Sequence, residues 1–268
     1  MGDIMPKLSA SIVVYNGAEE ALNAAASVLC HTAKYPLALY LVDNASPDGS
    51  GARLQQAVAE GALAAKEGQT VQVVCREVNG GFGTGHNTVL PLLDSDYHFI
   101  LNPDILLRED VLSGMADWLT ENPQAVMARP GLIFPDGKPQ QLPLQKCSAL
   151  ALVYRQLPQL SFLKRFNDRY VMEGVDLSKP TPIEFCTGSF SCLRTAVLKK
   201  IGGFDEKYFM YVEDADLTQK ARKEGLVYLL PQFTAVHAWH RAPHTDSSHF
   251  KMQLKSMLRY FSKWGFRF

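Results

Sequence analysis

Short apolar runs alternate with helical patterns through the first hundred residues, and this alternation constrains the fold more than any other feature. The apolar runs occur at residues 9–15, 37–42, 71–75 and 97–101, and the helical patterns at 18–30, 53–65 and 88–93. Strands and helices that alternate at this spacing form βαβ units. Such units build a mainly parallel sheet with helices on its faces. We therefore predict an α/β fold of Rossmann type, with a mostly parallel sheet flanked by helices.

The second half of the chain is less regular. We expect a hairpin turn at 132–138, a mixed, proline-interrupted region at 142–176, strands at 183–193 and 227–230, and helices at 196–201, 217–224 and 251–264. The last of these helices is amphipathic, and glycines follow the other two, as they commonly do at helix ends.

Composition and charge indicate a globular protein and give no general sign of a nucleic-acid partner. The chain has 268 residues, 47% of them hydrophobic, so it can bury a sizeable core. The formal net charge is zero, which gives no reason to expect a nucleic-acid partner. The charge is unevenly spread, because residues 241–268 contain six lysines and arginines but only one acid, Asp246.

Cysteine usage and hydropathy indicate the compartment. Five cysteines are scattered without a C-x-x-C pair, a pattern typical of reduced thiols in a cytosolic protein. Residues 1–10 lack the apolar core of a signal peptide. No stretch has about 18 uninterrupted apolar residues, the length expected of a transmembrane helix. We predict a cytoplasmic protein, at most peripheral on the inner face of the plasma membrane.

Polar loops follow the second and third predicted strands. Asp43 could accept a hydrogen bond from a nucleotide, or it could serve only the cap of the next helix. The segment 79–87 contains four glycines, which allow close approach of a ligand to the backbone, and Asn79, His86 and Asn87 add polar groups. Its spacing does not match the dinucleotide-binding G-x-G-x-x-G pattern, and such loops are often simple tight turns.

An acidic residue also follows the fourth predicted strand. Asp104 comes directly after Asn102 and Pro103, at the carboxyl end of the strand, where open α/β sheets bind their ligands. Mg²⁺ is commonly held by one or two carboxylates together with substrate phosphates. Asp104 is therefore a candidate metal ligand, although an ordinary Asn-Pro turn is the competing interpretation.

A second acidic segment lies about a hundred residues later. Glu213, Asp214 and Asp216 place three carboxylates within four residues, next to the apolar segment 209–211. A partly apolar pocket raises a carboxyl pKa toward the range of a general base, whereas a helix N-terminus would stabilise the same charges without catalysis. His237 follows another strand and is either a ligand or a core histidine. Together, the two segments suggest metal-assisted transfer on a phosphorylated substrate.

In their order along the chain, these motifs resemble the family-2 glycosyltransferases of the GT-A fold, and most closely the rhamnosyltransferase-like branch. The resemblance rests on residues 11–16, 42–46, 79–87, 101–104, 188–190 and 202–217, followed by His237. It implies inverting transfer of a sugar from a nucleotide-sugar donor to a hydroxyl of a polysaccharide or lipid-linked glycan. It also implies a divalent cation, Mg²⁺ or Mn²⁺, and favours dTDP-rhamnose as donor.

The resemblance assigns roles to individual positions. Donor-binding residues would be Tyr15, Asn16, Asp43, Asn79, Gly80, Phe82, Gly83, His86, Asn87 and Asn102. The metal ligands would be Asp104 and His237, the catalytic base Asp214 with Glu213 next, and the acceptor-side residues Gly188, Ser189 and Asp216. Asn102 stands where the D-x-D motif of the family has its first acid.

The same resemblance divides the chain. Residues 1–240 would form the GT-A catalytic domain, with a nucleotide-sugar-binding half at 1–104 and an acceptor-binding half at 105–240. Residues 241–268 would form a basic amphipathic helix that contacts anionic membrane or a second copy of the chain, or else packs on the catalytic domain. The alternative functions are a non-catalytic nucleotide-sugar-binding module and a nucleotidyltransferase, although the first strand is not followed by a glycine-rich loop that carries a lysine.

Overall fold

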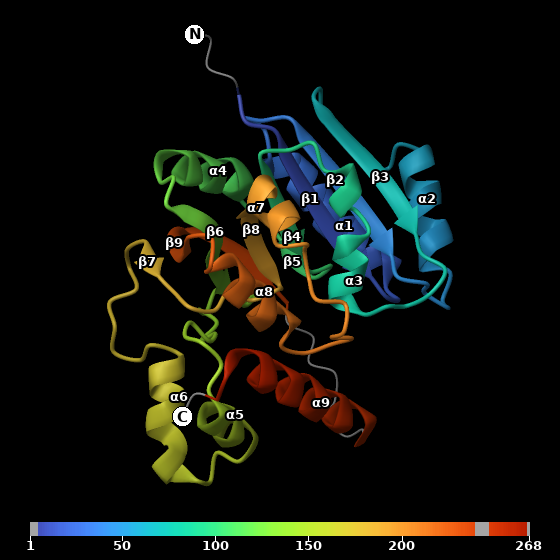
Figure 1. Cartoon of the computed structure of the whole chain (residues 1–268). Helices are drawn as coiled ribbons and strands as arrows, with labels where there is room; N and C mark the ends of the chain where they lie inside the picture. The colour runs from blue at the N-terminus through green and yellow to red at the C-terminus, as the bar shows by residue number, and fades with distance from the viewer. Residues whose placement is uncertain (1–4, 239–246, 267–268) are drawn as a thin grey trace.

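A mixed sheet with helices on both faces forms the body of the molecule (Figure 1). The computed structural model describes residues 5–238 and 247–266. Within them the strand order is β3-β2-β1-β4-β8-β6-β9-β5, and β7 pairs with β9 outside this path. The predicted domain boundary at residue 240 lies outside the described residues.

The first half of the sheet is parallel, as predicted. Its strands are β1 (Leu8–Val14), β2 (Leu37–Asp43), β3 (Gln69–Cys75) and β4 (Tyr97–Leu101). The intervening helices are α1 (Ala18–His31), α2 (Ser50–Ala59) and α3 (Phe82–Asn87). Because β1 pairs in parallel with both β2 and β4, the carboxyl ends of these strands lie at one edge of the sheet.

The second half joins the first through an antiparallel strand. β8 (Phe190–Arg194) lies between β4 and β6 (Ala125–Ile133) and runs antiparallel to both. β9 (Leu226–His237) continues in parallel to β6, and the short strands β5 (Ile105–Leu106) and β7 (Thr181–Pro182) pair with β9. The helices are α4 (Val111–Glu121), α7 (Thr195–Lys200) and α8 (Glu213–Ala221).

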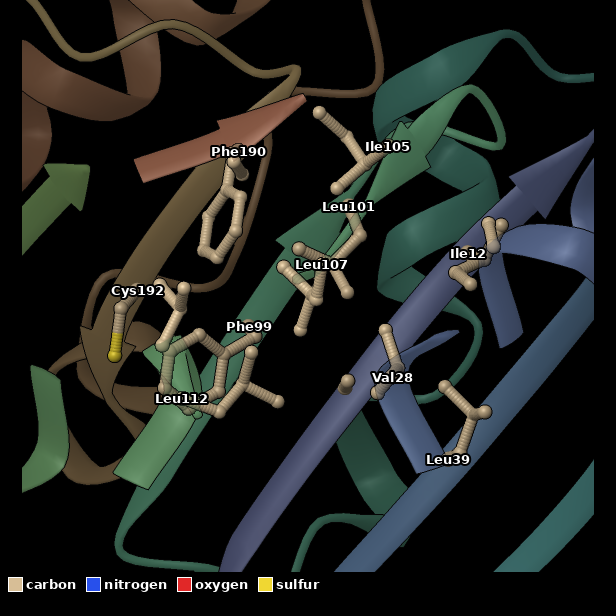
Figure 2. Packing of buried hydrophobic residues seen from close by; sticks show 14 of the residues in the cluster. Ile12, Val28, Leu39, Phe99, Leu101, Ile105, Leu107, Leu112, Phe190 and Cys192 are labelled. Atoms are coloured by element: carbon tan, nitrogen blue, oxygen red, sulfur yellow. The ribbon is translucent and has the colours of Figure 1, made fainter. Parts of the chain in front are cut away.

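Two hydrophobic cores lie on opposite faces of the sheet, because successive strand side chains point to opposite sides. Ile12 of β1 belongs to the first core with Val28 of α1 and Leu112 of α4, part of which Figure 2 shows. The neighbouring Val13 belongs to the second core with Leu198 of α7 and Leu217 of α8. Burial on both faces explains the continuous apolar runs of the central strands.

Several elements differ from their predicted extents, among them α2, which ends at Ala59 and not at residue 65, and β9, which continues to His237 and does not end at residue 230. The segment 79–87 contains helix α3, and the predicted helix at 88–93 is a single 3₁₀ turn (Leu90–Leu92). The predicted strand at 183–193 begins only at Phe190, because residues 183–189 form a loop. Helix α8 begins at Glu213, four residues before its predicted start.

A separate helical cluster lies beyond the sheet (Figure 1). It contains α5 (Ala149–Gln156), α6 (Lys164–Tyr170) and α9 (Ser247–Trp264), with the 3₁₀ turn Ser161–Leu163 before α6. Tyr260 and Phe261 of α9 are buried in a third hydrophobic cluster with Tyr208. Part of the apolar face of the predicted C-terminal helix is therefore packed against the rest of the chain. No helix in the described part of the chain is long and apolar enough to cross a bilayer.

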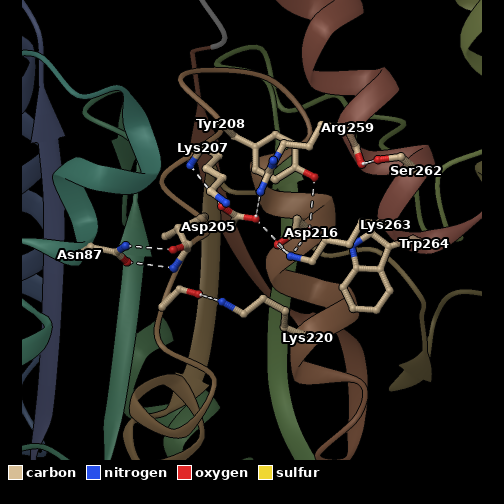
Figure 3. Close-up of polar contacts among 12 residues, drawn as sticks. Asn87, Asp205, Lys207, Tyr208, Asp216, Lys220, Arg259, Ser262, Lys263 and Trp264 are labelled. Atoms are coloured by element: carbon tan, nitrogen blue, oxygen red, sulfur yellow. Dashed lines mark hydrogen bonds and ion pairs between the residues drawn. The ribbon is translucent and has the colours of Figure 1, made fainter.

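Asp216 is the polar anchor of this packing (Figure 3). Its carboxylate accepts hydrogen bonds from Trp264 Nε1 at 2.7 Å and Lys263 Nζ at 2.9 Å, and from the hydroxyl of Tyr208 at 3.4 Å. Asp216 is 0% exposed. The structure therefore places this residue beneath α9, instead of at the acceptor position that we predicted for it.

We expect Asp216→Ala to destabilise the protein. The substitution leaves the Trp264 N–H without its buried acceptor and leaves Lys263 with Asp205 alone, at a cost of about 1–3 kcal/mol. Urea unfolding followed by circular dichroism measures this loss as a lower midpoint. Asp94→Ala is the control, because the Asp94 side chain is 93% exposed, and we expect no measurable change. Equal midpoints for Asp216→Ala and the wild type would contradict the anchoring role.

Candidate active site

A pocket of about 380 Å³ opens where the two halves of the sheet meet. The residues around it come from α3, the segment after β4, the segment after β6, the loops before β8 and α8, the start of α8 and the end of β9. They are Phe82, Asn102, Asp104, Leu142, Thr187, Gly188, Ser189, Met210, Glu213, Asp214 and His237. The structure thus brings together both predicted metal ligands, both predicted catalytic acids and two of the predicted acceptor residues.

Strand pairing places Asp104 beside His237. Ile105 of β5 lies opposite His237 of β9, so the preceding residue Asp104 reaches the same end of the strand pair. Asp104 Oδ1 is 3.4 Å from His237 Nε2. The amide nitrogen of Gln140 donates to the His237 carbonyl at 2.7 Å, and Gln140 Oε1 lies 2.9 Å from His237 Nδ1. The Nδ1–H therefore donates to Gln140, and in the neutral ring Nε2 presents an electron pair toward Asp104.

This donor set fits a divalent cation. A carboxylate oxygen and an imidazole nitrogen face the same cavity, and a second hydrogen bond orients the imidazole, as is usual for metal-bound histidine. Among the described residues, no group of three or more histidines, cysteines or acids is placed to hold a metal. Two protein ligands still suit a cation that substrate phosphates also bind.

A strained turn presents the two acids to the pocket. Tyr211 and Val212 have φ angles of 71° and 56°, values that are rare for residues other than glycine, and rarest for a β-branched residue such as Val212. Contacts from both sides hold the segment before them. The Phe82 amide donates to the Phe209 carbonyl at 3.2 Å, and Ser256 Oγ of α9 donates to the Met210 carbonyl at 2.8 Å.

Asp214 and Glu213 are electrostatically different. Asp214 Oδ2 accepts from the Gly188 amide at 3.0 Å, and Oδ1 accepts from the Ala215 amide at 2.8 Å. Burial raises the pKa of both carboxyl groups, while the two amide hydrogen bonds favour the ionised form of Asp214. Burial and then the Asp214 charge raise the pKa of Glu213 to about 8. Of the two carboxyl groups, Asp214 is therefore the one that ionises more readily, and Glu213 keeps its proton to higher pH.

The loop before β8 lines part of the pocket. The Asn102 amide donates to the Ser189 carbonyl at 2.9 Å, which joins this loop to the end of β4. Leu142, Thr187 and Met210 also line the pocket, and they were not among the residues predicted from the sequence. Thr187 Oγ1 lies 3.1 Å from Ser189 Oγ. In the sequence, Thr187 directly precedes the predicted site residues Gly188 and Ser189, and this position could have identified it as a pocket residue.

Several predicted donor residues lie near the ends of β1 and β2, outside this pocket. Asp43 is buried and accepts from the Ser46 amide at 3.3 Å, as in a turn. Asn79 Oδ1 accepts from the Gly81 amide at 2.9 Å and from Asn44 Nδ2 at 2.8 Å. Tyr15 is exposed, whereas the Asn16 amide donates to Ser46 Oγ. Donor contacts by these residues and Gly80 stay predictions.

His86, Asn87 and Gly83 have partners inside the protein instead. His86 is 4% exposed, its Nδ1 lies 2.7 Å from Ser11 Oγ, and burial holds its pKa well below the usual range. Asn87 Oδ1 accepts from the Phe204 amide, and its Nδ2 donates to the Phe204 carbonyl. A Cβ on Gly83 would lie 2.7 Å from Phe204 Cβ, so this glycine permits close packing.

Solved structures of glycosyltransferases share this fold. A mannosyltransferase from Pyrobaculum calidifontis, in complex with GDP-Man and Mn²⁺, matches with a TM-score of 0.63 at 15% identity, over 97% of this chain and 64% of that one. GalNAc-T7 with UDP, GalNAc and Mn²⁺ matches with a TM-score of 0.69 at 12% identity, over 98% of this chain and 48% of that one. The chain thus spans less than two thirds of either protein, and the match defines a GT-A-like fold.

Sequence comparison identifies the family. The model of glycosyl transferase family 2 matches residues 9–202, and the chain therefore belongs to this family. Rhamnosyltransferase WbbL from Escherichia coli is 30% identical over 207 residues, 69% of this chain and 73% of that protein. An N-acetylglucosaminyl-diphospho-decaprenol L-rhamnosyltransferase from Mycobacterium tuberculosis is 26% identical over 270 residues, 96% of this chain and 83% of that protein.

The raised pKa of Glu213 predicts a specific dependence of stability on pH. The folded state keeps a proton that the unfolded state releases above the ordinary pKa of 4.5, so this stabilisation is complete below about 4.5 and is lost as the pH rises through about 8. Glu213→Gln mimics the protonated side chain. Between pH 5 and pH 8, we expect the unfolding free energy of the wild type to fall by at least about 1 kcal/mol more than that of the variant. Parallel pH profiles from urea titrations would contradict the assignment.

Proposed function

We propose that this glycosyltransferase moves a sugar from a nucleotide-sugar donor to a hydroxyl of a lipid-linked glycan or polysaccharide, with inversion at the anomeric carbon and with a divalent cation. The observation that carries the proposal is the pocket that contains both Asp104 with His237 and Glu213 with Asp214. The names of the two bacterial relatives favour rhamnose as the transferred sugar. The motifs shared with the rhamnosyltransferase-like branch favour dTDP-rhamnose as donor.

In this proposal, the donor diphosphate lies at the Asp104 side of the pocket. Asp104 and His237 would hold Mg²⁺ or Mn²⁺, which when bound supplies positive charge against the departing nucleoside diphosphate. Bound Mn²⁺ in the two solved glycosyltransferases supports this choice of cofactor. Asn102 supplies an amide in place of a second acid, so phosphates of the substrate would have to supply the remaining ligands of the cation.

Asp214 is the general base. As the acceptor oxygen forms its bond to the anomeric carbon, its proton passes to the Asp214 carboxylate, and the bond between that carbon and the diphosphate oxygen breaks on the opposite face. The Gly188 amide fixes the orientation of the Asp214 carboxylate. The raised pKa of Asp214 makes it a stronger base than an exposed aspartate. Glu213, protonated, limits the negative charge beside the reacting centre.

In this proposal, the acceptor lies against Gly188, Ser189 and Thr187, which line the pocket. The mycobacterial relative is named for an acceptor that joins a sugar through diphosphate to a polyprenol. We infer an acceptor of the same chemical class for this chain. Contact of α9 with anionic membrane and formation of a homodimer stay predictions, and the buried Phe261 shows that part of the apolar face of α9 is covered within the chain.

Asp214→Asn tests the catalytic base. The amide cannot accept the acceptor proton, so we expect kcat to fall by about 10²- to 10⁴-fold while donor affinity stays within a factor of about three. Radiolabelled sugar transfer measures kcat, and calorimetry with the nucleoside diphosphate and Mn²⁺ measures affinity. Glu213→Gln is the comparison, because a neutral isostere of a protonated side chain retains much more of the rate. Normal turnover by Asp214→Asn would refute the assignment.

Asp104→Ala tests the cation site. The wild type is expected to melt at a higher temperature with dTDP and Mn²⁺ together than with either alone, because the cation and the diphosphate bind jointly. In the Asp104→Ala variant we expect this joint increase to disappear, while the melting temperature without ligand changes little. A full joint increase in the variant would place the cation elsewhere.

A further inference from the structure

A second cavity of about 650 Å³, which we call the groove, lies between α9 and the loop before α8. It is lined by Lys207, Phe209, Lys251, Met252, Lys255, Ser256 and Arg259. Four of these seven side chains are cationic, and none of them is acidic. A cavity with this lining favours an anionic ligand.

One of the four cationic side chains around the groove, Arg259, forms an ion pair with an acidic side chain. Arg259 pairs with Asp205 at 2.8 Å, as Figure 3 shows, and Lys263, one helical turn further on, also contacts that carboxylate. Lys251, Lys255 and Arg259 are spaced by four residues, so they form one cationic stripe along α9. With Lys207 on the opposing loop, this stripe surrounds a volume that phosphate groups can enter.

The groove adjoins the active-site pocket. Phe209 lines the groove, and the next residue, Met210, lines the pocket. Ser256, also in the groove, donates to the Met210 carbonyl at 2.8 Å. The two cavities therefore have the segment Phe209–Met210 as a common wall. A ligand with its sugar at Asp214 would have to pass over this segment to reach the groove.

An exposed apolar stripe runs beside the cationic one. Leu254 and Leu258 of α9 are 46% and 58% exposed, and each follows a groove lysine by three residues. Residues three apart on a helix are neighbours. An anionic group in the groove would therefore leave an attached hydrocarbon chain next to these leucines.

We propose that this groove binds the phosphate groups of a lipid diphosphate-linked acceptor. The inference rests on the proposed function, because it places the acceptor sugar at Asp214, the diphosphate among Lys207, Lys251 and Lys255, and the start of the lipid along Leu254 and Leu258. The groove thus selects acceptors by their charge, and it makes α9 part of the substrate-binding surface.

Direct binding tests the groove without requiring transfer. We expect a short-chain prenyl diphosphate, titrated by calorimetry into the wild-type protein in EDTA, to bind at least about tenfold more tightly than to Lys251→Gln/Lys255→Gln. Lys7→Gln/Lys66→Gln is the matched control, because it removes two charges next to the opposite ends of the strands and should bind as the wild type does. Equal affinities for the wild type and the groove variant would overturn the proposal.

Kinetics with two acceptors distinguish a phosphate site from a folding defect and from a membrane site. For the same sugar on a soluble prenyl diphosphate, we expect the groove variant to raise KM by about tenfold with little change in kcat. For that sugar on a neutral alkyl chain, we expect no change. Equal losses with both acceptors would indicate a folding defect, and a loss seen only on anionic vesicles would indicate a membrane site. Either result would overturn the proposal, whereas binding without transfer would refute only the proposed function.

Discussion

The pairing of β8 with β4 is the interaction on which the rest of the structure depends. Leu101, the last residue of β4, lies opposite Phe190, the first of β8. This antiparallel register brings the segment after β4, with Asn102 and Asp104, against the loop before β8, with Gly188. The apolar contact of Phe99 with Phe190 supports it from the core. The two halves of the sheet would otherwise present their polar loops at separate places.

That junction also explains the chemistry of the acidic pair. Gly188, fixed by its place before β8, donates its amide to Asp214, while Glu213 has no such amide donor from the loop. Two neighbouring buried carboxyl groups cannot both ionise cheaply, so the one with more hydrogen-bond donors takes the charge. The strained turn at Tyr211 and Val212 is retained because the third hydrophobic cluster and α9 hold it. We infer that α9 stabilises the geometry of the site as well as the fold.

The parallel half of the fold was predictable, because strand and helix patterns repeat with clear turns between them. The longer-range features were not. Asp216 has the local pattern of an active-site acid, and only the packing of Trp264 and Lys263 shows that it is an anchor. Gly83 has the pattern of a ligand-binding loop, yet it serves contact with Phe204, about 120 residues away. Helix α8 begins early because Tyr211 and Val212 form a left-handed turn before it. Neither tyrosine nor valine favours this conformation, so the sequence did not indicate the turn.

The central claim is that one pocket binds donor diphosphate at Asp104 and His237 and presents Asp214 to the acceptor. A crystal structure with Mn²⁺ and dTDP tests this most directly. We expect Mn²⁺ bound to Asp104 and His237, with the terminal phosphate directed into the cavity toward Asp214. Nucleotide or metal bound away from this pocket would contradict the claim, even if the fold were otherwise unchanged.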